Sequence, residues 1–203
     1  MTTSVHYAIV GSGNVGTALA RLFARAGVPV GIANTRGPES LSPLTDSLGD
    51  TVRALPLPEA LASDVIFMAI PFAAIQELGS NLPDWTGKIV VDTTNAHFSS
   101  GSEEVLQGRL STAYAAEYLP GAEVVKAFNQ LPANTLAAEL EPGIGRRVIF
   151  VASDSEKASE RIAALVDELG LAAVQLGRID EGGRLIQVPN ALVLRNLVER
   201  PLH

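Results

Sequence analysis

The stretch Val5-His6-Tyr7-Ala8-Ile9-Val10 runs directly into Gly11-Ser12-Gly13-Asn14-Val15-Gly16, and this junction decides the fold. The first part is mostly apolar and β-branched, which is typical of a buried strand. The second part matches G-x-G-x-x-G and opens a helical pattern over Gly13–Ala26. In this motif the first glycine permits a tight turn, the second lets backbone approach a pyrophosphate, and the third lets helix and strand pack closely. The junction predicts a dinucleotide-binding loop at the N-terminus of a helix, which favours phosphate groups.

Asn34-Thr35-Arg36 ends the next predicted strand, where NAD-binding proteins usually carry Asp or Glu. A carboxylate there accepts hydrogen bonds from the ribose 2′-hydroxyl and repels a 2′-phosphate. This chain offers an amide, a hydroxyl and a guanidinium instead, and Ser40 lies one helical turn beyond. Because arginine binds phosphate bidentately and keeps its charge, this pattern favours NADP(H) over NAD.

The rest of the chain alternates short apolar runs with helix-length amphipathic segments. The expected strands are Val5–Val10, Val28–Ala33, Val52–Leu55, Asp64–Ile70, Lys88–Asp92, Glu123–Phe128, Arg147–Ala152 and Ala173–Leu176. The expected helices are Gly13–Ala26, Leu41–Leu48, Glu59–Ala62, Phe72–Leu82, Glu103–Leu110, Ala133–Leu140, Glu156–Leu169 and Asn190–Arg200. This alternation predicts an α/β fold with a doubly wound, Rossmann-type, mostly parallel sheet. We expect a single NADP-binding domain over residues 1–203, in which 182–203 form a C-terminal loop and helix.

Composition and charge narrow the function classes. The 203 residues carry a net charge of −7, which disfavours nucleic acid as a partner. The longest apolar run is too short to span a bilayer, and the first residues do not resemble a signal peptide, so we expect a cytoplasmic protein without a membrane part. The chain has no cysteine, and its three histidines are scattered, so no metal site is expected.

Polar residues follow several strands at the edge where parallel strands end, and this edge is where ligands bind in such folds. Ala69, Ile70 and Pro71 predict a flat wall for the ribose and nicotinamide. Asn95 and His97 follow the next strand, and His97 is a candidate proton donor or a surface histidine. Further candidates follow: Lys126, which either pairs with Asp92 or faces the ligand, and Asn129.

Motifs of other chemistries are absent. The three tyrosines lack a lysine four residues on, which disfavours a short-chain dehydrogenase. The chain also has no G-x-S-x-G elbow and no P-loop lysine.

Taken together, these motifs resemble the family of NADP oxidoreductases that depend on coenzyme F-420, a deazaflavin. The resemblance rests on Gly11–Gly16, Thr35-Arg36, Asp64–Pro71, Lys88–Asp92, Pro120-Gly121-Ala122, Val124–Asn129, Arg147–Asp154 and Gly182-Gly183. It implies NADP(H) and a deazaflavin or flavin as second substrate, and a homodimer. It assigns the pyrophosphate to Ser12, Gly13, Asn14 and Val15, the 2′-phosphate to Thr35, Arg36 and Ser40, the nicotinamide border to Ile70 and Pro71, and the acceptor side to Thr94, Asn129 and Leu131, with the 182–203 tail completing it.

The chain differs from the family on the acceptor side. Archaeal members often have a histidine where Asn129 stands, and their C-terminal tails are longer. Three hypotheses therefore stay open: hydride transfer between NADPH and a flavin-like or deazaflavin acceptor, NADPH-dependent reduction of a small carbonyl or imine with His97 or Lys126 as proton donor, and a non-catalytic NADPH sensor.

Overall fold

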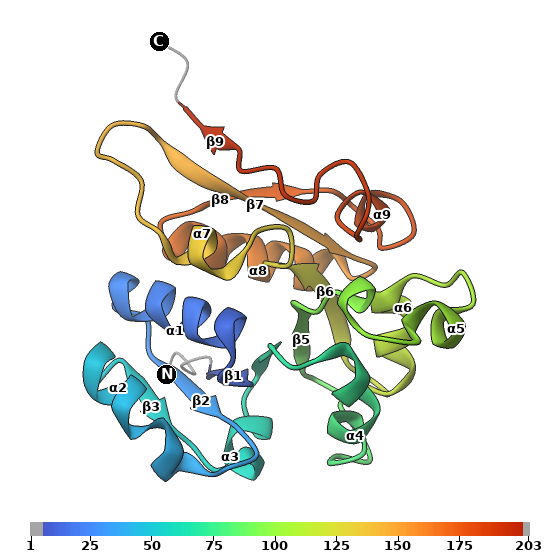
Figure 1. Ribbon diagram of the computed structural model, residues 1–203, viewed down its shortest axis with the longest axis horizontal. Coiled ribbons are helices and arrows are strands. Elements are labelled where there is room, and N and C mark those ends of the chain that lie inside the picture. Colours follow the sequence, from blue (N-terminus) through green and yellow to red (C-terminus); the bar gives the residue numbers. More distant parts are fainter. Residues whose placement is uncertain (1–5, 201–203) are drawn as a thin grey trace.

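The apolar runs form the strands of one mixed sheet, which the computed structural model describes over residues 6–200 (Figure 1). Each of the eight expected strands is present, although most are shorter than predicted, and Val5 lies outside the described residues. The strands are β1 (Tyr7–Val10), β2 (Val30–Ala33), β3 (Val52–Ala54), β4 (Val65–Met68), β5 (Ile89–Asp92), β6 (Glu123–Ala127), β7 (Arg146–Ser153), β8 (Ala172–Gln175) and β9 (Val198–Glu199).

The strand order is β3-β2-β1-β4-β5-β6-β7-β8, and β9 pairs with the start of β7. The first six strands are parallel, which confirms the Rossmann-type fold and places the reversal of strand order between β1 and β4. The β6–β7 pair is antiparallel, which the apolar pattern did not predict because a buried strand reads alike in either direction.

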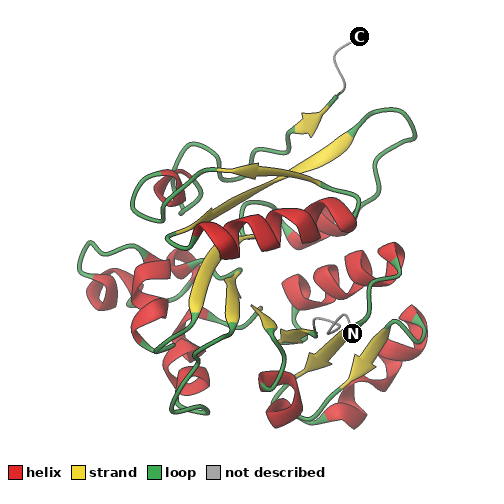
Figure 2. Ribbon diagram, turned by 180° about the vertical axis from the view of Figure 1, so that it is seen from behind, coloured by secondary structure: helices red, strands yellow, loops and turns green. Residues whose placement is uncertain are grey.

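Helices cover both faces of this sheet (Figure 2). The α-helices are α1 (Asn14–Ala26), α2 (Ser42–Leu48), α3 (Leu57–Leu61), α4 (Ile75–Gly79), α5 (Ser102–Leu106), α6 (Ser111–Glu117), α7 (Ala133–Ala137), α8 (Glu156–Glu168) and α9 (Gly182–Leu185). Three short 3-10 helices are η1 (Pro38–Leu41), η2 (Phe72–Ala74) and η3 (Ala96–Phe98).

Alternate residues of the central strands supply two separate cores. Tyr7 and Ile9 pack in the layer that contains α1, α2 and α8, whereas Ala8 and Val10 pack in the layer that contains α3, α4 and α6. This alternation follows from the period of two in a strand, and it buries both faces of the sheet. Because both faces of the central strands are covered, a ligand can reach the sheet only at the ends of these strands.

The C-terminal segment is where the helix prediction is wrong. The expected helix Asn190–Arg200 is absent; the chain is irregular there and then extended, and Val198–Glu199 pairs with Arg146 and Arg147. Arg147 also donates from Nε to Asn196 Oδ1 at 3.0 Å, and Leu194 N donates to the Gln130 carbonyl at 2.7 Å. These tertiary contacts override local helical preference, and the segment runs along β7 and β8 (red in Figure 1).

Helix boundaries near the middle of the chain also differ from the prediction. The expected helix Glu103–Leu110 stops at Leu106, because Gln107 and Gly108 adopt left-handed φ angles of 49° and 82°. A separate helix, α6, then begins at Ser111, and it was not predicted. Its N-terminal turn is held by the tail, since Gln187 Oε1 accepts from Ser111 N at 2.8 Å.

Candidate functional site

The turn between β1 and α1 requires glycine at two places. Gly11 has φ 110°, and a Cβ there would lie 2.1 Å from the Ala69 carbonyl oxygen. A Cβ on Gly16 would lie 1.9 Å from the Gly11 carbonyl oxygen. These close approaches hold β1, β4 and α1 together at the point where the strand order reverses, which is the usual ligand crevice of the fold.

Gly13 differs from these two glycines because nothing in the protein lies within 4 Å of its Cβ position. It is exposed and is the N-cap of α1, with no side-chain hydrogen bond to the first turn. The amide groups of Asn14 and Val15 follow in the first turn of α1, at the positive end of the helix dipole. This arrangement suits a pyrophosphate, for which a bare backbone at position 13 leaves room.

Side chains at the end of β2 form one hydrogen-bonded group with the glycine loop. Asn34 Nδ2 donates to Ser12 Oγ at 2.9 Å and to Ser40 Oγ at 3.0 Å. Asn34 Oδ1 accepts from Arg36 N at 2.9 Å, and Arg36 Nη2 lies 3.5 Å from Ser12 Oγ. Arg36 and Thr35 are exposed, so the guanidinium and the hydroxyl remain available to a ligand. The structure thus brings together the residues assigned to the 2′-phosphate.

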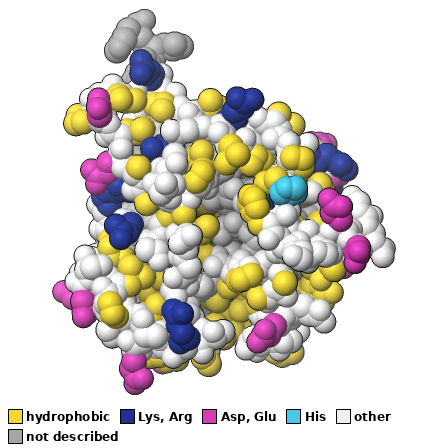
Figure 3. All heavy atoms as spheres, in the orientation of Figure 1, with side chains coloured by type: hydrophobic (Ala, Val, Ile, Leu, Met, Phe, Trp, Pro, Cys, Tyr) yellow, Lys and Arg dark blue, Asp and Glu magenta, His cyan; other side chains and the backbone are white. Residues whose placement is uncertain are grey.

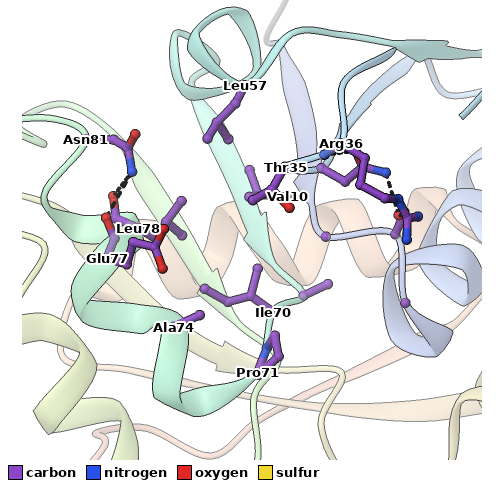
Figure 4. A pocket seen from close by; sticks show the side chains of 15 residues that line it. Val10, Thr35, Arg36, Leu57, Ile70, Pro71, Ala74, Glu77, Leu78 and Asn81 are labelled. Atoms are coloured by element: carbon purple, nitrogen blue, oxygen red, sulfur yellow. Dashed lines mark hydrogen bonds between the residues drawn. The ribbon is translucent and has the colours of Figure 1, made fainter. Parts of the chain in front are cut away.

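A cavity of about 490 Å³ opens beside this group. In Figure 4, Thr35 and Arg36 stand on one wall, Glu77 and Asn81 on the opposite wall, and Ile70 and Pro71 between them. On this side the molecule is hollowed, and hydrophobic side chains border the hollow (Figure 3). The lining residues are Val10, Gly11, Ser12, Gly13, Asn34, Thr35, Arg36, Leu57, Ala69, Ile70, Pro71, Ala74, Glu77, Leu78 and Asn81. An apolar slot with polar groups at its ends fits a planar base joined to a phosphorylated ribose.

The wall formed by Leu57, Ala74, Glu77, Leu78 and Asn81 was not among the predicted site residues. A signal was present, because positions 74, 77, 78 and 81 follow helical spacing after Pro71 and lie on one side of the segment that includes α4. Sequence alone did not show that this side faces the crevice rather than the core.

On the acceptor side, Lys126 forms a buried ion pair with Asp92, with Nζ 3.1 Å from Oδ2. Of the two roles considered for Lys126, the structure has this internal pair rather than a side chain facing a ligand. Burial opposes ionisation of Asp92, but the Lys126 charge and hydrogen bonds from Thr112 and Thr94 outweigh it and lower the pKa of the carboxyl. The Asp92 carboxyl is therefore ionised at neutral pH.

Asn95 and Asn129 join the ends of β5 and β6. Asn95 Nδ2 donates to the Asn129 carbonyl at 2.9 Å, and Asn129 Nδ2 donates to Asn95 Oδ1 at 3.0 Å and to the Ile186 carbonyl at 2.6 Å. Within residues 6–200, Asn129 Oδ1 is buried without a hydrogen-bond partner. The backbone before it is constrained, since Phe128 has φ 60° in a region that non-glycine residues rarely adopt.

Three other predicted residues are placed less favourably for direct contact with an acceptor. Thr94 Oγ1 donates to Asp92 Oδ1 at 2.7 Å, and the side chain of Leu131 packs in the core. His97 is exposed and lines a separate cavity of about 220 Å³, away from the residues of the glycine loop. The structure therefore does not gather the acceptor-side residues into the crevice beside Arg36.

Two kinds of site are not found within residues 6–200. No cluster of three or more His, Asp or Glu side chains in this part of the chain could hold a metal ion. A search of the same residues finds no helix with the length and apolar character needed to cross a membrane.

Comparison with known proteins connects this site to a family. Residues 6–96 match the family described as NADP oxidoreductase, coenzyme F420-dependent, and this range covers the glycine loop, Arg36 and the wall at 69–71. The crystal structure of a hypothetical protein from Sinorhizobium meliloti is similar over 98% of both chains, with 43% identity and a TM-score of 0.92.

More distant relatives share the fold or part of the chain. A candidate F420-dependent NADP reductase from Arthrobacter sp. FB24 is 23% identical, covers 87% of this chain and 86% of its own, and has a TM-score of 0.66. A glycerol-3-phosphate dehydrogenase [NAD(P)+] from Acidiphilium cryptum is 28% identical over 109 residues, which are 50% of this chain and 34% of that enzyme. The match thus spans about a third of that curated relative. The chain belongs to one family with the Sinorhizobium meliloti protein, and its residues 6–96 match the model of the family described as NADP oxidoreductase, coenzyme F420-dependent.

Proposed function

We propose that the protein binds NADPH and transfers a hydride between it and a flavin-like or deazaflavin acceptor, such as coenzyme F420. The observation that carries the proposal is the continuous crevice at the ends of β1, β2 and β4. At one end of this crevice lies the N-terminus of α1, where Gly13 has open space at its Cβ position. At the other end lie Asn34 and Arg36, in the region where NAD-specific proteins carry a carboxylate. The family description, which names both NADP and coenzyme F420, supports the same assignment.

In this proposal the adenosine half of NADPH occupies the 490 Å³ cavity. The adenine lies among Leu57, Ala74 and Leu78, and the 2′-phosphate meets Arg36, with Thr35 and Ser40 as further donors. The pyrophosphate crosses Ser12 and Gly13 and accepts from the amides of Asn14 and Val15. Ala69, Ile70 and Pro71 then direct the nicotinamide half toward the ends of β5 and β6, on the other side of the strand-order reversal.

The acceptor ring would lie against the nicotinamide on the side of Asn95 and Asn129, whereas Thr94 and Leu131, which are buried, would support this side from within. One hydride, with its electron pair, leaves the dihydronicotinamide and bonds to the central ring of the acceptor; NADPH is oxidised, the acceptor is reduced, and solvent supplies any further proton. Such a transfer needs two rings held in contact and little acid–base chemistry from the protein. Asn129, which follows β6 on this side, has a buried Oδ1 without a hydrogen-bond partner within residues 6–200, and we assign this oxygen to the polar edge of the acceptor ring.

Reduction of a carbonyl or imine would also need a proton donor at the reacting atom. Lys126 is engaged by Asp92, and His97 is exposed at a different cavity, so neither is placed for that role. These positions favour hydride transfer to a conjugated ring over the carbonyl alternative.

Oxidation of NADPH by the purified protein, followed at 340 nm with coenzyme F420, FMN and riboflavin as parallel acceptors, tests the proposal. NADH serves as the control donor. We expect turnover with NADPH and at least one of the three ring acceptors, and much slower turnover with NADH. Turnover only with small carbonyls or imines would replace the proposed acceptor, and NADPH binding without oxidation by any acceptor would indicate a sensor.

Two further proposals are a homodimer, which rests on the family resemblance, and a cytoplasmic location, which rests on the apolar runs being too short to span a bilayer. Phe98 and Leu194 are apolar and 76% and 68% exposed, and we assign them to the surface that a second copy covers. Light scattering during size-exclusion chromatography distinguishes a dimer from a monomer directly.

A further inference from the structure

Three residues lie in a row across the strands next to the crevice, at the last position of β4 and β5 and one position before the end of β6. Met68, Asp92 and Lys126 are register partners across β4, β5 and β6. Two of the three carry charge although their side chains are at most 2% exposed. Alternation along β6 would place an apolar residue at position 126, so the charge there needs an explanation.

The buried charges hold the turn that follows β5. Lys126 Nζ donates to the Thr94 carbonyl at 2.5 Å as well as to Asp92. Asp92 Oδ1 accepts from Thr94 N at 2.9 Å and from Thr94 Oγ1 at 2.7 Å. Thr94 is therefore fixed at its amide, its hydroxyl and its carbonyl by one ion pair. The other carboxylate oxygen accepts from Thr112 Oγ1 of α6 at 2.7 Å.

The Thr93–Asn95 turn contacts two parts of the proposed site, the wall that begins at Ala69 and the Asn95–Asn129 pair. Thr93 Oγ1 donates to the Met68 carbonyl at 3.0 Å, immediately before Ala69, where the crevice wall begins. On the other side, Asn95 exchanges hydrogen bonds with Asn129 at the end of β6. A displacement of the turn would therefore move the nicotinamide wall and the Asn95–Asn129 pair together.

Stability alone accounts poorly for this arrangement. Removing two charges from water carries a large desolvation cost for each ion, and apolar replacements of buried pairs are often neutral or stabilising. The best-documented role of buried ion pairs is to favour one conformation of the protein over competing conformations. The left-handed backbone at Phe128, a conformation that costs free energy for a non-glycine residue, lies in the same region and is held by the surrounding packing.

We propose that Asp92 and Lys126 are positioning residues that hold the Thr93–Asn95 turn in the geometry required by the nicotinamide half of NADP(H). The inference rests on the proposed function, because it requires the nicotinamide to lie over the ends of β4, β5 and β6. It assigns to the ion pair a role in one half of the dinucleotide site and none in the adenosine half, where Arg36 and Ser40 act.

The test compares two ligands that share the adenosine half. Calorimetry measures the Kd of NADP+ and of 2′,5′-ADP, which lacks the nicotinamide half, for the wild-type protein and Lys126→Met. We expect Lys126→Met to weaken NADP+ about tenfold, equivalent to about 1.4 kcal/mol, and 2′,5′-ADP less than twofold. The fluorescence of bound NADPH, which comes from the dihydronicotinamide ring, should shift in the same variant.

Two matched controls separate this role from general disturbance. Lys88→Met removes a lysine that also donates to a carbonyl, that of Ser63 at 3.1 Å, but at the opposite edge of the sheet. Thr112→Val removes a hydrogen bond to the same carboxylate without touching the turn. Neither control should alter the ratio of the two Kd values. If Lys126→Met leaves too little folded protein, Asp92→Asn/Lys126→Met removes both charges and is expected to change the ratio in the same direction.

Equal weakening of both ligands, or no change in either, in a folded Lys126 variant would overturn the positioning role. Failure of the wild-type protein to bind NADP+ and 2′,5′-ADP would overturn the proposed function, and this inference with it. The two failures are distinguishable because the first leaves wild-type binding intact.

Discussion

Replacing Arg36 with alanine should separate NADP(H) from NAD(H) binding, because the guanidinium faces the crevice and is exposed. A phosphate monoester carries a charge of about −1.5 to −2 at pH 7. In a water-like dielectric each pair of unit charges about 4 Å apart contributes about 1 kcal/mol. The water-like value applies since Arg36 is exposed, so the loss is about 1.5 to 2 kcal/mol, or about 13- to 30-fold in Kd.

Calorimetric titration of Arg36→Ala with NADP+ and NAD+ measures this difference. The Kd for NADP+ should rise by the stated factor, whereas the Kd for NAD+ should change less than twofold. The backbone amide of residue 36 still donates to Asn34 Oδ1 in the variant, so the turn after β2 is preserved. Arg53→Ala is the matched control, since Arg53 is also an exposed arginine but lines a cavity apart from the crevice.

The dependence on pH and salt provides a second check on the reasoning. The second pKa of a phosphate monoester is near 6, so the advantage that Arg36 gives to NADP+ should shrink as the pH falls below about 6. It should also shrink at high ionic strength, because the Debye length falls from about 10 Å at 0.1 M to about 3 Å at 1 M. Equal losses for NADP+ and NAD+, or no loss for NADP+, would refute the placement of the 2′-phosphate at Arg36.

Three other predictions concern the loop, the core and the buried carboxylate. Gly16→Ala should lower the Tm by several degrees because its Cβ would meet the Gly11 carbonyl, whereas Gly13→Ala should keep the Tm and weaken NADP+ binding; thermal unfolding and calorimetry together check the pair. Trp85→Phe should cost about 1 to 2 kcal/mol in the free energy of unfolding, measured in urea, because a buried carbonyl loses its bond from the Trp85 indole. Asp92 has a lowered pKa in the folded protein, so its contribution to stability is present above about pH 4, the unfolded value, and is lost as the pH falls through the folded pKa. The stability difference between wild type and Asp92→Asn should accordingly be constant from pH 5 to 7 and shrink in acid; a difference that grew in acid would contradict the direction of the shift.

Local sequence predicted the structure best at positions where only one residue type satisfies the physical requirement. The glycine loop, the strand before it and the change from a carboxylate to Asn34-Thr35-Arg36 each depend on contacts between residues close in sequence, or on the ligand itself. The strands were recognisable for a similar reason, because burial on both faces leaves a continuous apolar run. None of these inferences needed to know which segments meet across the fold.

Long-range contacts decided the remainder. The direction of β7 and the extended tail depend on pairing with residues tens of positions away, so Asn190–Arg200 was predicted as a helix although it forms none. The sequence also left Lys126 with two roles, and only the register of β5 with β6, which sets its Nζ beside Asp92 and the Thr94 carbonyl, selected one. The sequence by itself determined the Rossmann-type fold and predicted NADP(H) as the dinucleotide, whereas tertiary structure alone decided which polar groups face the crevice and which are hydrogen-bonded within the protein. The physical reason is that a buried charge or hydroxyl must find its partner wherever the chain brings one, and a linear pattern does not contain that information.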